Sequence, residues 1–413
     1  MKVILVAALL LVATAVPASA DFEGWGREVL GPMDGWGAGT TGGSTATHVY
    51  TVHTRSQLVT ALTGDTPKIV YVAGTVNGNV DDHNRRITCD QYADPGYSLD
   101  AYLKQYDPAT WGTAPVTGPL EDARARSQAN QQARVIVPVG ANTTIVGLGD
   151  DATLRGVNLS VRTNNVIIRN LRFEDAYDCF PSWDPTDGAT GNWNSEYDNL
   201  TLTGATHVWV DHCEFSDGDN TQLPTYFGHR WEVHDGLFDM VNGTDLVTAT
   251  YNYLHDHDKS MLLGNTDKPT YDVGKLRITL HHNMFENLGQ RAPRVRYGQV
   301  HVYDNLYVIP DSAQYTYSLG VGVESRIYAE NNFFEVARDV NPSAILHYWK
   351  GTAVHVSGSL VNGRPVDLVA AYNRDFDPDL GTDVGWRPTL VTHVDPTAAV
   401  PHLVRDRVGV GRN

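Results

Sequence analysis

A repeated pattern of short apolar segments constrains the fold of this chain more than any other feature. Six segments place β-branched or apolar residues before a polar residue, usually asparagine, and apolar residues after it: NVIIRNLRF, HVWVDHCEF, LVTATYNYL, LRITLHHNMF, VHVYDNLYV and RIYAENNFF. Aligned on the polar residue, they form a column separated by 42, 40, 31, 22 and 27 residues: Asn170, His212, Asn252, Asn283, Asn305 and Asn332. The shortest separation suits one coil of a parallel β-solenoid, and the longer ones leave room for loops inserted at a turn. We therefore expect an all-β fold, a parallel β-solenoid.

The asparagine column has a structural explanation. Each side chain carries a donor and an acceptor, so it can bond its own backbone and its equivalents in neighbouring coils, which satisfies groups that would otherwise be buried without partners. We assign the same structural role to His212. A β-sandwich is the competing fold, but Asn-Gly hairpin signals are scarce. The segment SQLVTALTG is expected to form a short helix that caps the first coil, and residues from about 340 onward are expected to wrap along the outside.

The first twenty residues have the pattern of a secretory signal, with one lysine, an apolar run and a small-residue end. We therefore expect residues 1–20 to be a signal peptide and residues 21–413 to form one secreted domain with a C-terminal wrapping segment. No other apolar run approaches the ~18 residues of a membrane span. The net charge of −17 argues against binding to nucleic acid.

Three cysteines permit at most one disulfide bridge. Export would make a bridge between Cys89 and Cys179 possible, and the sequence leaves its formation open. Cys213 lies inside a strand-like segment and is expected to be a small buried side chain.

Acidic residues in the longer insertions suggest a metal site. Glu196 and Asp198 are two residues apart and would face the same side of an extended segment. Asp235 and Asp239 would come together if their segment turns once. A set of oxygen ligands suits a hard cation, and calcium fits better than zinc. By spacing alone, these residues are also compatible with ordinary surface acids.

Three arginines crowd into the segment RAPRVR between two predicted strands. Arg291, Arg294 and Arg296 are expected on a short connection that Pro293 stiffens, and loops on rigid scaffolds are where sites are usually built. Lys259 also follows a strand, so it could project from the same face one coil away. Its neighbours His255 and His257 are compatible with a transition-metal site or with surface residues.

Several segments together resemble the extracellular bacterial pectate lyases, polysaccharide lyase family one. VWVDHCEFSDG resembles the W-x-D-H motif of that family, HDG with a later Asp resembles its calcium segment, and HHNMFENLGQRAPRVRYGQVHVYDN resembles its catalytic arginine segment. The resemblance extends from about residue 50 to 390. It implies a right-handed parallel β-helix, a calcium cofactor, and cleavage of polygalacturonate (pectate) by β-elimination in a secreted monomer.

Residue roles follow from the same resemblance. Arg291 matches the base, and Lys259 and Arg296 match residues that hold the substrate. The implied calcium ligands are Asp198, Asp235 and Asp239, with Glu196 as an additional acidic ligand of some members. Calcium and cationic side chains would stabilise the negative charge that spreads into the sugar carboxylate after the C5 proton leaves. Arg294 receives no role beyond a surface or strand pairing.

Three other functions compete with this interpretation. A polygalacturonase would share the solenoid but hydrolyse its substrate with paired carboxylic acids. A pectin lyase would act on methyl esters without calcium, whereas the three aspartates favour the calcium enzyme. A non-catalytic pectin-binding solenoid is disfavoured by the presence of Arg291, Arg296 and Lys259 together. Endo or exo attack and the tolerated degree of methylation stay open.

Overall fold

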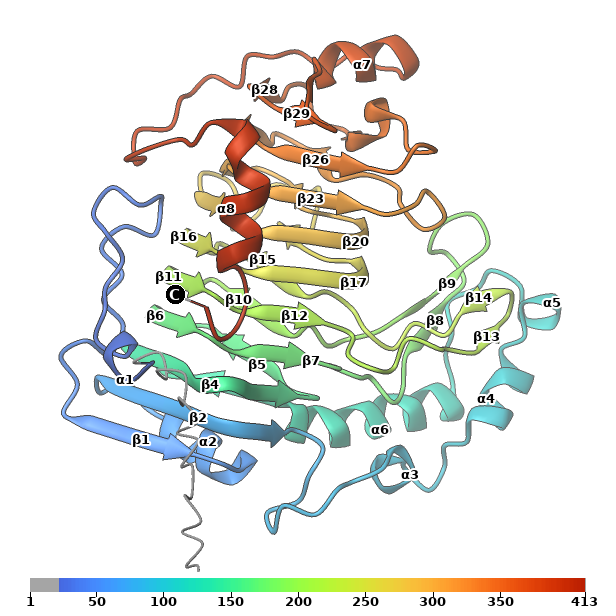
Figure 1. The fold of residues 1–413 in the computed structure, drawn as a ribbon. Coiled ribbons are helices and arrows are strands. Elements are labelled where there is room, and N and C mark those ends of the chain that lie inside the picture. Colours follow the sequence, from blue (N-terminus) through green and yellow to red (C-terminus); the bar gives the residue numbers. More distant parts are fainter. Residues whose placement is uncertain (1–21, 413) are drawn as a thin grey trace, which may run out of the picture.

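The computed structural model describes residues 22–412, and within them the chain winds as a stack of coils (Figure 1). The predicted signal, residues 1–20, lies outside the described residues. Each full coil contributes three short strands in a fixed order, and equivalent strands of successive coils pair in parallel. The fold is a parallel β-helix, which confirms the predicted class.

Three parallel sheets, named here A, B and C, run along the stack. Sheet C holds the first strand of each coil: β3 (Ile136–Val139), β5 (Asn158–Val161), β10 (Leu200–Thr203), β15 (Phe238–Val241), β18 (Leu262–Leu263), β21 (Arg294–Val295), β24 (Leu319–Gly322) and β27 (Leu346–Trp349). Sheet A holds the second: β1 (His48–Val52), β2 (Lys68–Asn77), β4 (Thr143–Arg155), β6 (Asn164–Arg169), β11 (Thr206–Asp211), β16 (Asp245–Thr250), β19 (Ile278–His281), β22 (Gln299–Tyr303), β25 (Arg326–Glu330) and β28 (His355–Ser357). Sheet B continues from β2 and β4 with the third: β7 (Arg172–Glu174), β12 (Glu214–Ser216), β17 (Tyr253–Lys259), β20 (Met284–Gln290), β23 (Leu306–Ile309), β26 (Phe333–Val336) and β29 (Leu360–Val361), which ends in an antiparallel pairing with β30 (Arg364–Pro365).

Side chains that point into the coils stack on their equivalents in the next coil. Phe285 lies over Tyr307 with ring centroids 4.9 Å apart, and Tyr307 lies over Phe334 at 4.5 Å. These rings belong to one continuous apolar core that runs through the stack. A slip of one residue would turn each inward side chain outward, so the core fixes the register of the strands.

The asparagine column lies at the bend between sheets A and B. Asn252 Nδ2 donates to Asn283 Oδ1 (2.9 Å), Asn283 Nδ2 to Asn305 Oδ1 (3.0 Å), and Asn305 Nδ2 to Asn332 Oδ1 (3.0 Å). These four residues are almost fully buried. The predicted structural role of this part of the column is confirmed.

The predicted column is wrong by one residue in its first two members. Asp211 pairs with Thr250, so Cys213 and not His212 occupies the position next to Asn252. Cys213 N donates to Asn252 Oδ1 at 2.9 Å. The two displaced residues belong instead to the preceding column of left-handed residues, with φ between 51° and 55°: Asn170, His212, Tyr251, His282, Asp304 and Asn331. An alignment on polar residues misplaced them because the ladder position in these two coils is filled by the buried side chains of Leu171 and Cys213.

Helices close the two ends of the core. The predicted N-terminal cap is α2 (Arg55–Leu62), whose Leu58 and Leu62 are fully buried in the core cluster, and it follows the four-residue α1 (Phe22–Trp25). The coils do not end near residue 340 as expected, because β27, β28 and β29 build one more turn. That turn is covered by α7 (Leu368–Asp375).

After α7 the chain returns along the outside of the coils (Figure 1). The C-terminal strap, defined here as residues 376–399, leads to α8 (Val400–Arg407), which lies across sheet B in Figure 1. Val400 and Val404 of α8 pack on Met284 and Leu306. Two 3-10 turns accompany these elements, η1 (Pro342–Ile345) and η2 (Thr397–Ala399).

A helical insertion between β2 and β3 was not anticipated from the sequence. It contains α3 (Cys89–Tyr92), α4 (Leu99–Gln105), α5 (Pro108–Trp111) and α6 (Pro119–Val135). A disulfide joins Cys89 of α3 to Cys179 in the loop after β7, and Cys213 is free and buried. Two small hairpins lie beside the insertion, β8 (Ser182–Asp184) with β9 (Asn192–Asn194) and β13 (Thr225–Tyr226) with β14 (His229–Arg230). Within residues 22–412, no helix is long and apolar enough to cross a membrane.

Candidate active site

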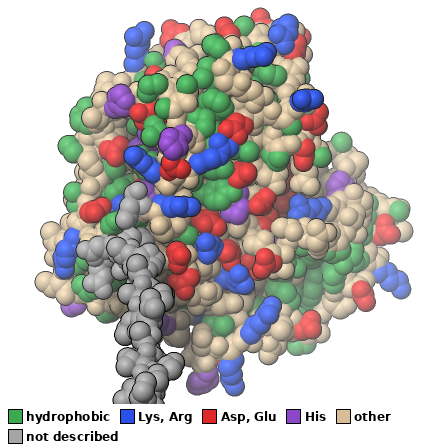
Figure 2. Space-filling model, viewed as in Figure 1, with side chains coloured by type: hydrophobic (Ala, Val, Ile, Leu, Met, Phe, Trp, Pro, Cys, Tyr) green, Lys and Arg blue, Asp and Glu red, His purple; other side chains and the backbone are tan. Residues whose placement is uncertain are grey.

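The candidate residues gather where coils pass from sheet B to sheet C. Two coils carry long loops at this turn, residues 175–199 and 217–237, and the next two cross it within a few residues. Figure 2 shows acidic side chains on this face near the ends of β7, β12 and β17. The turn therefore combines a rigid parallel scaffold with loops that can hold charged side chains.

Two buried carboxylates meet beside Gly236. Asp198 precedes β10, and Asp239 lies in β15, the next strand of sheet C; each residue is 7% exposed. Asp198 Oδ1 accepts a hydrogen bond from Gly236 N (2.8 Å), and Asp239 Oδ1 accepts one from Leu262 N (2.9 Å). A Cβ atom at position 236 would lie 2.6 Å from Asp239 Oδ1 and 2.8 Å from Asp198 Oδ1. Only glycine leaves room for both carboxylates at this point.

The electrostatics of this pair call for a positive charge. Burial raises the pKa of Asp198 above its ordinary value, and the Asp235 carboxylate raises it further. Burial also raises the pKa of Asp239, and the charges of Asp198 and Asp235 add to that shift. A nearby cation would favour the ionised forms instead. The donor set is entirely carboxylate oxygen, so the residues fit Ca²⁺.

Asp235 does not close on the buried pair. Its Oδ1 lies 3.4 Å from Lys259 Nζ, and Glu232 Oε1 lies 3.7 Å from the same nitrogen. Over residues 22–412, Asp198, Asp235 and Asp239 do not form a group whose ligand atoms all lie within 4.8 Å of one another. Burial lowers the pKa of Lys259, but Asp235 and Glu232 outweigh that effect and raise it. Glu232 was missed from the sequence, which gives it no signal beyond its acidic type.

Glu196 is not aimed with Asp198. The segment between β9 and β10 is not a strand, so the expected alternation of side chains does not apply. Glu196 is exposed, and its main-chain N donates to Asp178 Oδ2 at 3.1 Å. The structure brings Asp198 and Asp239 together and leaves Glu196 outside that pair.

Lys259 and Arg291 lie on adjacent coils, as the sequence suggested. Lys259, the last residue of β17, pairs with Gln290 of β20, and Arg291 follows directly with φ of 62°. The carbonyl oxygen of Arg291 accepts hydrogen bonds from Met261 N (2.7 Å) and Ser260 Oγ (2.6 Å), which fixes its backbone. In the described structure its Nε is buried and has no hydrogen-bond partner. The Arg291 guanidinium is close enough to the acidic pair for its charge to lower the pKa of Asp239. Its Nε is free to donate a hydrogen bond to a ligand.

The other two arginines have different surroundings. Arg296 is 9% exposed and donates from Nε to Asp267 Oδ1 and from Nη1 to Gly264 O, both at 2.7 Å. Arg294 lies in strand β21 and not on a loop, and its guanidinium carbon stacks 3.8 Å from the ring centroid of Trp349. Burial lowers the pKa of Arg294 to about 10, followed by the charge of Arg296. The charges of Arg296 and Arg291 thus add to the effect of burial in disfavouring the charged form of Arg294.

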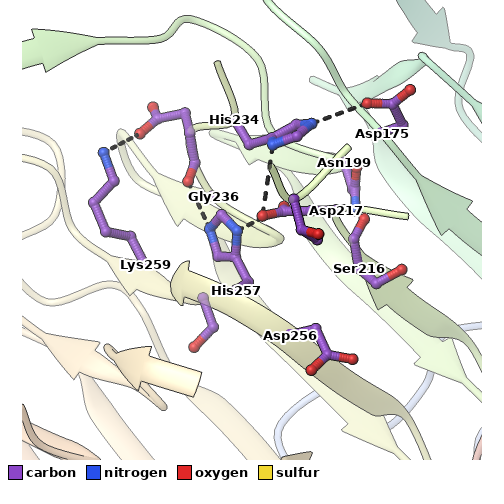
Figure 3. A network of polar contacts seen from close by, with 12 residues as sticks. Asp175, Asn199, Ser216, Asp217, His234, Gly236, Asp256, His257 and Lys259 are labelled. Atoms are coloured by element: carbon purple, nitrogen blue, oxygen red, sulfur yellow. Dashed lines mark hydrogen bonds and ion pairs between the residues drawn. The ribbon is translucent and has the colours of Figure 1, made fainter. Parts of the chain in front are cut away.

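A network of alternating histidines and aspartates connects the loop of residues 217–237, which carries Asp235, to the neighbouring coils (Figure 3). Asp175 Oδ1 lies 3.0 Å from His234 Nε2, and Asp217 Oδ2 lies 3.5 Å from His234 Nδ1. The other Asp217 oxygen lies 2.7 Å from His257 Nδ1, and His257 Nε2 contacts the carbonyl oxygen of Asp235 at 2.8 Å. Both nitrogens of His257 face acceptors, so the ring holds the loop as a doubly protonated donor.

His255, two residues before His257, does not belong to this network. His255 Nδ1 lies 2.8 Å from Asp256 Oδ2, and its ring stacks on Tyr253 at 4.2 Å. The two histidines have separate partners, so they do not form the alternative metal pair. No local sequence pattern indicated the network of His234 and Asp217, because its members come from different coils.

Comparisons with known proteins agree on one family. A family model described as "Pectate lyase" matches residues 115–368. A Bacillus subtilis pectate lyase is 49% identical over 100% of this chain and 99% of its own length, and Dickeya chrysanthemi pectate lyase A is 33% identical over 82% and 79%. Among solved structures, a pectate lyase bound to a hexasaccharide is 48% identical with a TM-score of 0.90, covering 94% of this chain and 98% of that one. A pectate lyase from Acidovorax avenae is 31% identical with a TM-score of 0.86, covering 98% and 99%.

Proposed function

Because the chain belongs to the pectate lyase family and is an enzyme of that type, we propose that it cleaves polygalacturonate by calcium-dependent β-elimination, with Arg291 as the base. The observation that carries the proposal is the buried Asp198 and Asp239 pair beside Lys259 and the partnerless Arg291 Nε. Buried carboxylates that a cation would stabilise lie near an arginine whose Nε has no partner among the described residues. A galacturonate acid group together with Ca²⁺ would satisfy both.

In this proposal Asp198, Asp239 and Asp235 hold Ca²⁺, and the exposed Glu196 is a further candidate ligand. When bound, Ca²⁺ supplies positive charge to the substrate carboxylate and to the buried aspartates. Asp235 pairs with Lys259 in this structure, and in the proposal its carboxylate also binds the Ca²⁺ held by Asp198 and Asp239. Removing any of the three aspartates should therefore raise the calcium concentration needed for activity.

The chemistry assigned to the protein side chains is a proton abstraction and an elimination. Arg291, in its neutral form, takes the proton from C5 of a galacturonate. The electron pair of the C5–H bond forms the C4–C5 double bond, and the bond from C4 to the glycosidic oxygen breaks, with solvent protonating the leaving oxygen. Lys259 and Arg296 offset the charge that spreads into the C6 carboxylate, which stabilises the transition state more than the ground state.

Arginine is ordinarily protonated, so the neutral form of a catalytic arginine becomes more abundant as the pH increases. Arg294 and Arg296 lie on the same short segment as Arg291. The positive charge of Arg291 also acts to lower the pKa of Lys259. Neighbouring positive charge makes an additional proton unfavourable. We therefore expect the rate to increase from neutral toward alkaline pH.

The test follows absorbance in the near ultraviolet during incubation with polygalacturonate, because elimination creates a conjugated double bond and hydrolysis does not. Activity should disappear in excess chelator and return when calcium is added. Highly methyl-esterified pectin, assayed in parallel, separates this function from that of a pectin lyase, which would remain active in chelator. Full activity on polygalacturonate in chelator would refute the calcium requirement. We also propose that the enzyme is exported and acts as a monomer, which fractionation and light scattering can check.

A further inference from the structure

A second cluster of metal-ligating side chains lies at the bend between sheets A and B, away from the candidate active site. In the described part of the chain it is the one group of three or more such residues whose ligand atoms all lie within 4.8 Å of one another: His282, Asp304 and Asp395. His282 Nε2 is 2.9 Å from Asp395 Oδ2 and 3.9 Å from Asp304 Oδ2. His393 Nε2 lies 3.3 Å from Asp395 Oδ1, at the edge of this group. One histidine and two aspartates thus converge from two coils and the C-terminal strap.

One atom of this cluster lacks a partner. Asp304 is fully buried, and its Oδ1 has no hydrogen bond within residues 22–412. Its other oxygen accepts a hydrogen bond from the main-chain N of Asp395 at 2.8 Å. A buried carboxylate oxygen without a partner carries a desolvation cost of about 1–3 kcal/mol, so it is normally hydrogen-bonded or bound to a cation. This observation points to a ligand at the cluster.

The residues behind His282 would orient it as a metal ligand. His282 Nδ1 lies 2.8 Å from His281 Nδ1, and His281 Nε2 lies 3.0 Å from Asp34 Oδ1. If His282 Nε2 binds a cation, its single proton is on Nδ1 and donates to His281, whose own proton then faces Asp34. Metal-binding histidines typically donate their second N–H to such a partner, which fixes the tautomer. The contact between His281 and Asp34 is a close approach and not a hydrogen bond, because His281 Nε2 has no hydrogen-bond partner within residues 22–412.

From these contacts we propose that His282, Asp304 and Asp395, with His393 at the rim, bind a divalent transition-metal ion such as Zn²⁺. Imidazole and carboxylate ligands together suit Zn²⁺ better than Ca²⁺, which prefers oxygen alone. Ligands at about 2.0–2.2 Å from Zn²⁺ stand about 3–4 Å from one another, close to the spacings here. The side chain of His393 is 70% exposed, so an ion can enter from solvent.

Such an ion would fasten the C-terminal strap to the coils. Asp395 already reaches the bend through its main chain, since its carbonyl oxygen accepts a hydrogen bond from Asn331 Nδ2 at 2.8 Å. The strap leads directly into α8, which covers the outer face of sheet B (Figure 1). The metal therefore joins the last covering segment of the chain to coils that are remote from it in sequence.

The test uses the full-length mature protein, stripped of metal, and Zn²⁺ alone as the probe. Isothermal titration is expected to show one Zn²⁺ per chain and an increase in thermal stability. Asp395→Asn should weaken Zn²⁺ at least about tenfold, because the loss of an outer partner alone costs about 10–100-fold. Asp379→Asn, an exposed aspartate of the same strap, is the matched control and should bind Zn²⁺ as the wild type does.

Three further measurements keep the proposal separate from the calcium site. Asp239→Ala should retain the Zn²⁺ affinity, and His393→Gln should reduce it. Limited proteolysis should cut the strap more slowly when Zn²⁺ is present in the wild type, and this protection should vanish in Asp395→Asn. Zn²⁺ binding that is absent, that survives Asp395→Asn unchanged, or that disappears in Asp239→Ala would overturn the assignment, whatever the outcome of the lyase assays.

Discussion

Two regions of the stack, the asparagine ladder and the turn between sheets B and C, treat polar groups in opposite ways. At the bend between sheets A and B, the ladder of Asn252, Asn283, Asn305 and Asn332 gives each buried amide a partner in the next coil. At the turn between sheets B and C, Asp198 and Asp239 face each other, and Arg291 keeps a buried nitrogen without a partner. The asparagine ladder satisfies its polar groups internally, whereas the turn between sheets B and C leaves them for a ligand. Incomplete satisfaction on a rigid scaffold is a signature of a binding site.

The strongest test of this contrast removes the base from the incomplete turn. Arg291→Lys is expected to reduce kcat by about 10²–10⁴-fold, the usual contribution of a general base, while KM changes little. A lysine keeps the positive charge but does not reproduce the planar guanidinium or its reach. Steady-state kinetics on polygalacturonate across neutral to alkaline pH measures both constants.

Arg296→Lys is the matched variant on the same segment. It should raise KM by about tenfold, the equivalent of one charge-assisted hydrogen bond, with a smaller change in kcat. If Arg291→Lys retained near-normal kcat, another residue would have to remove the proton.

The complementary test damages the satisfied bend. Asn305 Nδ2 donates to Leu280 O (2.9 Å) and Tyr303 O (3.0 Å) as well as to Asn332. Asn305→Ala would leave these buried oxygens without a donor and should reduce the free energy of unfolding by about 2–4 kcal/mol. Urea denaturation gives this value, and activity per folded molecule should be unchanged at low temperature.

Asn362→Ala is the control for the ladder variant. Asn362 also bonds the main chain of Val336 through both side-chain atoms, but it is exposed. Its loss should cost less than about 1 kcal/mol because water replaces the bonds. Equal losses in the free energy of unfolding for the two substitutions would show that burial in the ladder does not increase the contribution of these hydrogen bonds.

A smaller effect is expected on the pH dependence of stability, which should arise from the turn between sheets B and C and not from the asparagine ladder. Burial raises the pKa of Asp198 to about 7 from 3.8, and that of Asp239 rises as well. A carboxyl group whose pKa is raised by folding contributes stability below its ordinary pKa and loses it as pH rises through the folded value. Calcium-free protein should therefore lose stability on the order of 2 kcal/mol between about pH 4 and pH 7.

Urea denaturation of the calcium-free wild type and of Asp239→Asn over that pH range measures this loss. The variant removes one of the two repelling charges, so its profile should be flatter. Added calcium should abolish the decline in the wild type at neutral pH. A wild-type profile that is flat without calcium would contradict the electrostatic account of the pair.

The sequence predicted the architecture because the β-helix repeats a local pattern. Apolar residues around each bend identified strands such as β19 and β22, and the short spacing between coils identified the solenoid. The prediction failed where a coil departs from the pattern. Cys213 fills a ladder position without being polar, and the last coil, built by β27 to β29, carries no asparagine in the ladder column.

The candidate site was predictable in composition but only partly in geometry. Resemblance selected Lys259 and Arg291, and the pairing of β17 with β20 places them on adjacent coils. Spacing wrongly joined Glu196 to Asp198, because a loop does not alternate its side chains as a strand does. Contacts such as Glu232 with Lys259 depend on how long loops return to the scaffold, and no local pattern encodes that path.

The helices at the two ends of the stack have a consequence for growth of the fold. A parallel β-helix has no intrinsic length, since each coil offers the next an open apolar cross-section and free strand edges. Here α2 inserts Leu58 and Leu62 at one end, while Leu368 and Val369 of α7 cover the other. Without such plugs, the ends of different molecules could join into fibres, as exposed edges of sheets tend to do. The two short helices thus cap the ends of the stack and limit the number of coils.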